Sequence, residues 1–406
     1  MMLFEWKKIF ERRLNVAAMI LGYLLIAVCV FSWISEASFY DEETGSYLGG
    51  IEAIRSEQEW AKGKTDVISE EYITQVIREI QSHGMDLESD EAYLEIARPL
   101  GDVFYFIVRS YTDMDERYID RNVLMEIDLT DGAHFYEQRM RKIREYLNRD
   151  FSYGNYKEAE KDFWIQKAEN TVTPFAWGDK CIMDMVLSSV ATGFYLVFVI
   201  VICTSAVFSS EYESGASSLL LTTKYGKDRL IWSKIAVSVF FTVGYLSLGI
   251  LLAVVVIGVL FGFPGADLPI QLWDSVIPYN LTIAQACLGF FALILLIGIT
   301  VAFIQLFCSV TLRSSLATMV VGVAIIIAPI FFPMSNKSGL WNHINSLFPI
   351  RAANLKEMLG SFVSYTVGDY VISYVAMTVI VYTAIAISAL LLIRRGFAKA
   401  EPKAFR

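Results

Sequence analysis

The sequence is poor in the side chains that build disulfides and metal sites. It contains five cysteines and three histidines in 406 residues. Cys29, Cys203, Cys287 and Cys308 lie in or beside long apolar segments, and the histidines lie far apart, without the short spacing that zinc ligation uses. We therefore expect no disulfide framework, no metal and no other cofactor.

The sequence also lacks a nucleotide-binding loop. No segment follows the pattern G-x-x-x-x-G-K-[ST], whose backbone amides would hold phosphate groups. We therefore do not expect the chain to hydrolyse ATP or to be an enzyme, and we expect no nucleic-acid partner. If the chain moves a solute, the energy must come from a partner protein or from an ion gradient.

Ionisable side chains are nearly absent from the long apolar segments. Ion-coupled carriers keep such groups inside the membrane, where they are costly and serve function. Asp184 and Asp369 lie only near the outer ends of predicted spans, so anchoring at the interface explains them better than a proton relay. This absence argues against a gradient-driven carrier and favours one that is powered by another chain.

Apolar residues, in contrast, are abundant and gathered in blocks. They make up 55% of the sequence. A helix needs about 20 apolar residues to cross the hydrocarbon core of a bilayer, and six blocks are near or above this length: 15–34, 185–208, 235–261, 283–307, 316–332 and 370–393. This pattern predicts an all-α polytopic membrane protein with six transmembrane helices, five of them within 181–406.

The distribution of Lys and Arg predicts the orientation in the membrane. Positive residues concentrate in cytoplasmic loops. Residues 1–14, 208–234, Arg313 and the basic tail 394–406 together carry 14 of them, whereas the remaining connections outside 35–180 carry 3. We therefore expect a multi-pass protein of the plasma membrane with both termini in the cytoplasm.

Residues 1–14 combine apolar and basic residues. Leu3, Trp6, Ile9 and Phe10 fall at helical spacing among four Lys and Arg. Two interpretations are open. The segment is either an amphipathic helix lying in the headgroup plane or a basic flank that orients the first span.

Residues 35–180 form an acidic insert between the first and second spans, with 32 acidic and 17 basic side chains. Apolar stripes over 72–80 and 136–147 predict two helices, and a third is expected over 89–98, stopped by Pro99. Residues 103–108 fit a buried strand or a piece of helix. We expect a mainly helical extracellular domain that folds on its own core without disulfides.

A polar bridge, residues 208–234, connects the second and third spans. Composition alone favours an ordinary basic loop, but the spacing of certain residues is more specific. Phe208 is followed at fixed intervals by Glu211, Gly215, Leu219, Leu220, Thr223, Arg229 and Lys234. This spacing resembles the segment after the second span in permease subunits of bacterial type 2 ATP-binding-cassette exporters.

The resemblance implies a function and partners. In that family the segment forms a coupling helix and its return, which dock on a separate ATPase subunit, and an interfacial helix precedes the first span. The resemblance implies two permease subunits, as a homodimer or heterodimer in the lipid bilayer, with two ATPase subunits. It implies export of a drug, peptide or lipid-like substrate.

The roles of two bridge residues stay open at this level. Gly215 could let the backbone of a partner approach closely, or it could end a helical turn. Glu211 could meet a basic residue of a partner or cap a helix. Arg229 and Lys234 could contact the ATPase or anchor the third span to lipid headgroups.

Two other classes of function also stay open. One is a non-transporting sensor or immunity subunit that binds an external ligand through the insert. The other is a membrane-embedded enzyme acting on lipid or cell-wall precursors, which would need converging carboxylates or histidines that we do not find in the sequence.

Overall fold

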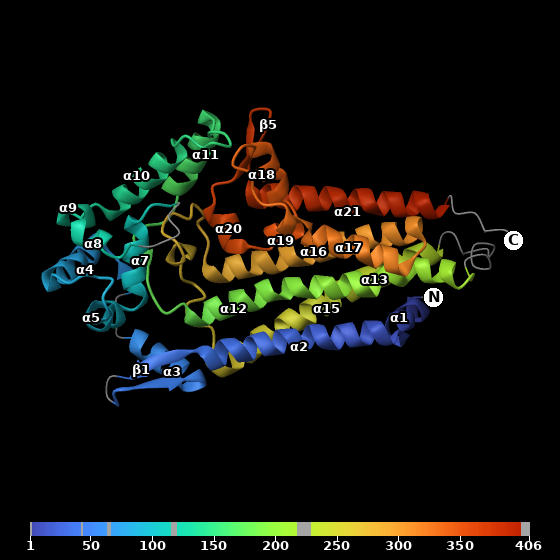
Figure 1. The fold of residues 1–406 in the computed structure, drawn as a ribbon, viewed down its shortest axis with the longest axis horizontal. Coiled ribbons are helices and arrows are strands. Elements are labelled where there is room, and N and C mark those ends of the chain that lie inside the picture. Colours follow the sequence, from blue (N-terminus) through green and yellow to red (C-terminus); the bar gives the residue numbers. More distant parts are fainter. Residues whose placement is uncertain (1, 42–43, 63–65, 115–119, 217–228, 399–406) are drawn as a thin grey trace.

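Long helices dominate the computed structural model, which describes residues 2–41, 44–62, 66–114, 120–216 and 229–398. Five helical segments are long and apolar enough to cross a membrane, and they run side by side (Figure 1). They are α2 (Arg13–Glu36), α12 with α13 (Cys181–Thr192 and Leu196–Glu213), α15 (Arg229–Phe261), α16 (Ile283–Leu312) and α21 (Tyr374–Ala398). The chain is therefore a helical multi-pass membrane protein.

A sixth apolar helix is shorter. Helix α17 (Ser315–Phe331) has 17 residues and packs against α13 and α16. The side-chain amide of Gln305, buried in the middle of α16, lies 3.0 Å from the Thr318 carbonyl and 3.2 Å from the Gly322 amide of α17. A Cβ on Gly322 would lie 1.5 Å from the Gln305 amide group, so only glycine allows this contact. A sixth span at α17 remains a prediction.

The predicted range 370–393 for the last span begins too early. Residues Tyr370–Ser373 are a strand, β6, which pairs with β5 (Ser364–Val367) in an antiparallel hairpin. Gly368 turns the chain between them with a φ of +60°, a conformation that favours glycine. Because the β-branched and aromatic residues of 370–373 suit both a strand and an apolar helix, hydropathy alone could not separate them.

The insert is mainly helical, with two small antiparallel pairs of strands (Figure 1, left). Its helices are α3 (Gly50–Ala61), α4 (Glu70–His83), α5 (Asp90–Ala92), a π-helical turn (Tyr93–Ala97), α6 (Arg98–Leu100), α7 (Asp102–Tyr111), α8 (Val123–Glu126), α9 (Leu129–Gly132), α10 (Phe135–Leu147) and α11 (Glu158–Glu169). Strand β1 (Ser38–Asp41) pairs with β2 (Ser46–Gly49), and β3 (Val67–Ile68) pairs with β4 (Phe175–Ala176).

Local signals explain why α4 forms where its apolar stripe predicts. Ser69 caps the helix by accepting a hydrogen bond from the Tyr72 amide at 3.1 Å. Glu70 and Glu71 occupy the first turn, where the helix dipole favours negative charge. Gly84, with a φ of +62°, ends the helix.

Pro99 does not stop the third helix as expected. The backbone stays helical through Leu100. The helix then ends at Gly101, whose φ is +55°. A π-helical turn, Tyr93–Ala97, precedes Pro99, and in it the Arg98 amide donates to the Tyr93 carbonyl. Because this turn widens the helix, the helix can include a proline, which has no amide donor. Residues 103–108, which fitted either a strand or a helix, belong to helix α7.

The insert shares its core with two loops that lie beyond it in the sequence. The first is residues 262–282, with the 3-10 turn Ile270–Leu272. The second contains α18 (Gly339–Ser346), α19 (Pro349–Ala352) and α20 (Leu355–Gly360). Trp164 of the insert is 1% exposed and packs edge-on against Tyr279 and Phe362, one from each loop.

A buried arginine joins the insert to the first of these loops. Arg139 of α10 is 4% exposed and donates hydrogen bonds to the carbonyls of Ser275 and Ile277. It also bonds within the insert, to Thr171 at 3.1 Å. The core of the insert therefore continues into the 262–282 loop.

The N-terminal helix α1 (Met2–Glu11) lies at the end of the helical bundle opposite the insert (Figure 1). Its apolar side chains Leu3 and Phe4 are 86% and 64% exposed, whereas Glu5 is 5% exposed. The helix therefore points apolar residues outward and one carboxylate inward. Helix α21 ends at this same end of the bundle (Figure 1).

Candidate functional site

The structure brings together two of the residues that the bridge pattern singled out. Helix α13 continues to Glu213 and α15 begins at Arg229, so Glu211 and Lys234 both lie in helices rather than in a loop. Lys234 Nζ lies 2.8 Å from Glu211 Oε1. The pair joins the helix that enters the bridge to the helix that leaves it.

Two residues of α1 complete this site. Glu5 Oε2 lies 2.9 Å from Lys234 Nζ, and Lys8 Nζ lies 2.9 Å from both Glu5 Oε1 and Glu211 Oε1. Lys234 also donates to the Val207 carbonyl at 2.6 Å. We call Glu5, Lys8, Glu211 and Lys234 the four-residue charge cluster. It joins α1, α13 and α15 through alternating charges.

Three members of the cluster are buried. Lys234 is 0% exposed, Glu5 is 5% and Glu211 is 7%, while the Lys8 side chain is 32% exposed. Burial alone would lower the pKa of Lys8, but its hydrogen bonds to Glu211 and Glu5 outweigh that effect and raise it. Two carboxylates therefore face two ammonium groups, which suits charges held away from water.

Residues at the end of α13 also form hydrogen bonds with the start of α17. Glu213 accepts hydrogen bonds from the Ser315 amide at 2.6 Å and from its hydroxyl at 2.9 Å. The hydroxyls of Ser209 and Ser315 lie 2.8 Å apart, and Ser309 of α16 accepts from the Ser209 amide at 2.8 Å. The last turns of α13 are thus bonded to four other helices.

The remaining bridge residues divide into two groups. Gly215 follows the end of α13 with a φ of +76°, and a Cβ there would meet no atom of the described residues within 4 Å. This geometry fits a glycine that ends a helix. Arg229 is exposed at the first position of α15. Leu219, Leu220 and Thr223 lie outside the described residues.

The burial of Lys234 excludes one of the two roles expected for it. Because its side chain is 0% exposed and paired with two carboxylates, it does not anchor α15 to lipid headgroups. The sequence pattern did not single out Glu5 or Lys8. The spacing of Glu5 and Ile9, four residues apart, places them on the same face of a helix, and the structure shows that this face is buried.

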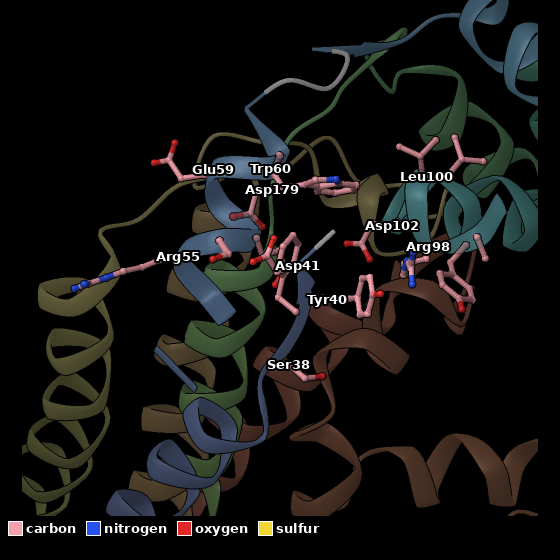
Figure 2. Close-up of a pocket in the computed structure, with 18 of the residues that line it drawn as sticks. Ser38, Tyr40, Asp41, Arg55, Glu59, Trp60, Arg98, Leu100, Asp102 and Asp179 are labelled. Atoms are coloured by element: carbon pink, nitrogen blue, oxygen red, sulfur yellow. The ribbon is translucent and has the colours of Figure 1, made fainter. Parts of the chain in front are cut away.

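A second feature lies at the other end of the molecule, between β1, α3 and residues 93–105, which run from the π-helical turn into α7. It is a cavity of about 770 Å³. Asp41, Asp102 and Asp179 lie around the same space, while Arg55 and Glu59 point away from it (Figure 2). Arg98 lies over the Tyr40 ring, 4.0 Å from its centroid.

Two carboxylates of this cavity have unusual surroundings. Burial, and then the charge of Asp179, raise the pKa of Glu57, and burial is also the main cause of the raised pKa of Asp179. Asp179 Oδ1 accepts a hydrogen bond from the Cys181 amide at 2.8 Å, and its Oδ2 is buried without a partner among the described residues. Lys180 pairs instead with Asp102, and with Asp184 at 3.6 Å.

No group of three or more His, Cys, Asp or Glu among the described residues is arranged to hold a metal ion. Comparisons of the chain with protein families, with characterised proteins and with solved structures gave no match.

Proposed function

We propose that this chain is the permease subunit of an ATP-powered exporter of the ATP-binding-cassette type 2 class. A separate ATPase subunit would dock on the bridge, and a second permease subunit would complete the path for a drug, peptide or lipid-like substrate. The observation that carries the proposal is the four-residue charge cluster, together with the resemblance of the bridge that supplies two of its members, Glu211 and Lys234.

The cluster supports this function because it makes the base of the bridge rigid. A nucleotide bound to another chain can act on this one only through contacts that differ between states. Force applied to the bridge would reach α13 and α15 together, because Glu211 and Lys234 join them. Through Glu213 it would also reach α17, and through Glu5 it would reach α1.

The proposal places the bridge and both termini in the cytoplasm of a plasma-membrane protein and the insert outside. It is supported by the count of Lys and Arg and by the position of α1 and the end of α21 opposite the insert (Figure 1). The proposal assigns no ATPase chemistry to this chain.

Reconstitution with an ATPase tests the proposal. The chain is purified with the ATP-binding-cassette ATPase encoded nearest to its gene, and ATP hydrolysis is measured in proteoliposomes. We expect a stable complex whose turnover falls at least tenfold in Glu211→Ala, while Lys7→Ala, a surface residue of α1, keeps it. Failure of the ATPase to bind the wild-type chain would contradict the proposal.

The cavity in the insert favours a second candidate, a sensor or immunity subunit that binds an external ligand without moving it. The two candidates differ in one measurement. A sensor changes the activity of its partner when ligand is added, and no substrate crosses the vesicle membrane.

A further inference from the structure

The geometry points to a binding site for an organic cation with an aromatic body in the insert cavity. This inference does not depend on the proposed export function. The cavity opens between the β1–β2 hairpin with α3 on one side and residues 93–105, from the π-helical turn into α7, on the other, next to the outer end of α12 (Figure 2). Its volume of about 770 Å³ lies within the range of small-molecule sites.

The lining is rich in aromatic side chains. The rings are Phe39, Tyr40, Tyr47, Trp60, Tyr93, Tyr105 and Trp177. Aromatic faces attract cations because the ring quadrupole is negative above the ring plane. The cavity already contains one such contact, since the guanidinium of Arg98 lies 4.0 Å from the centroid of Tyr40. An intramolecular cation thus shows that at least one ring face is placed to receive positive charge.

The charge of the described lining also favours a cation. Five acidic residues line the cavity, Asp41, Glu57, Glu59, Asp102 and Asp179, and two basic ones, Arg55 and Arg98. Lys180, which lies next to Asp102, forms ion pairs with Asp102 and Asp184. Among the described residues, neither Glu57 nor Asp179 forms an ion pair with Lys180, although its charge acts on both.

Partial burial makes this arrangement of carboxylates costly. Water solvates Glu57 and Asp179 incompletely, which is why their carboxyl groups hold protons more tightly than usual and their pKa values are raised. Asp179 Oδ2 has no hydrogen-bond partner in the described structure. A bound cation would remove the repulsion between the two carboxylates, and an anion would increase it. An aromatic body would fill the space between the rings.

Binding is tested on the full chain in detergent, without an ATPase. The probe is benzyltriethylammonium, which combines a quaternary cation with one ring, and binding is followed by calorimetry and by quenching of tryptophan fluorescence, since Trp60 and Trp177 line the cavity. Benzyl alcohol and phenylmethanesulfonate are the matched neutral and anionic controls. We expect saturable binding of the cation at one site and no saturable binding of the sulfonate.

Isosteric variants locate the site. Glu57→Gln and Asp179→Asn keep the shape of the side chains, and the asparagine keeps the oxygen that accepts from the Cys181 amide. We expect each to weaken binding of the cation at least tenfold, whereas Asp162→Asn, an exposed carboxylate of α11, leaves it unchanged. Melting temperatures of all three variants check that the fold is kept. Equal binding of cation and sulfonate, or unchanged affinity in both cavity variants, would overturn the assignment.

Discussion

Lys234 and Glu211 form a buried ion pair of 2.8 Å that connects the two helices on either side of the bridge. Both residues follow the spacing that resembles the coupling segment of type 2 exporter permeases. Their position changes how that resemblance is interpreted. These two residues hold the base of the bridge, so a partner would contact residues farther along it.

The pair makes a direct prediction for stability. Lys234→Ala leaves Glu5 and Glu211 buried with Lys8 alone, and removing one partner of a buried pair costs about 3–5 kcal/mol. Lys7→Ala is the matched control, because Lys7 pairs with Glu11 at the surface and such pairs contribute less than about 1 kcal/mol. Chemical denaturation in detergent measures both. Equal effects of the two substitutions would show that the cluster carries no special stability.

Substitutions of Gly215 can distinguish backbone strain from the loss of a contact with a partner. Its φ of +76° penalises a residue with a side chain by about 1–2 kcal/mol, and an added Cβ meets no atom of the described residues within 4 Å. Gly215→Ala and Gly215→Trp therefore share the same backbone cost but differ in bulk. If the ATPase docks closely here, the tryptophan variant loses assembly and the alanine variant keeps it. Loss in both would indicate strain, and assembly in both would place the docking surface elsewhere.

Much of the membrane architecture could be predicted from apolar length alone. The five long helices match five of the predicted blocks, because hydrocarbon thickness fixes how long such a helix must be. The ends were less predictable. Helix α15 begins at Arg229 rather than at 235, since a buried partner for Lys234 allows a charged residue inside the helix.

The candidate site could be predicted only in part. The pattern singled out Glu211 and Lys234 but left Glu211 between contact with a partner and a helix cap, and Lys234 between contact with the ATPase and anchoring to lipid headgroups. Besides pairing with each other, they pair with residues of α1, more than 200 positions from Glu211 in sequence. Long-range pairing of this kind depends on how α1 folds back on the bundle, and no local periodicity reports it.

The insert was the least predictable part. Its apolar stripes correctly indicated helices α4 and α10. They could not show that Trp164 and Arg139 pack on two loops from elsewhere in the chain. A stripe shows only that a face is covered, and the covering surface here comes from 262–282 and from the segment around Phe362.

The orientation in the membrane can be tested by labelling. Single cysteines at Asp162 and Asn336 are expected to react with a membrane-impermeant thiol reagent in intact cells, and one at Lys7 only after lysis. All three positions are exposed, so a difference reports the side of the membrane and not burial. The five native cysteines are replaced first. Labelling of the Lys7 position from outside would reverse the proposed topology.

Arg139 tests how firmly the insert is attached to the 262–282 loop. Arg139→Ala removes a charged donor from the Ser275 and Ile277 carbonyls, which costs about 2–3 kcal/mol. Hydrogen exchange is expected to rise in peptides covering 268–283. Arg141→Ala on the same helix is the control, because Arg141 is 63% exposed and pairs with Glu145 at the surface. Unchanged exchange in the arginine 139 variant would show that the loop is held by apolar packing alone.

The raised pKa values of Glu57 and Asp179 predict how stability depends on pH. A carboxyl group whose pKa is higher in the folded state binds its proton more tightly there than in the unfolded chain. Its contribution to stability is therefore fully present below the pKa of the unfolded chain and is lost as the pH rises through the raised pKa of the folded state.

Asp102, Lys180, Cys181 and Asp184 also face this pair, so the comparison must isolate the two carboxyls. The double variant Glu57→Gln with Asp179→Asn removes their titration and keeps their volume. Melting temperatures in detergent are measured between about pH 5 and pH 8, the range in which carboxyl groups with raised pKa values lose their protons. We expect the wild type to lose more stability than the double variant as the pH rises, and the variant to be the more stable of the two at the upper limit. Parallel curves would show that the pair is solvated like ordinary surface carboxylates, and Asp162→Asn should follow the wild type throughout.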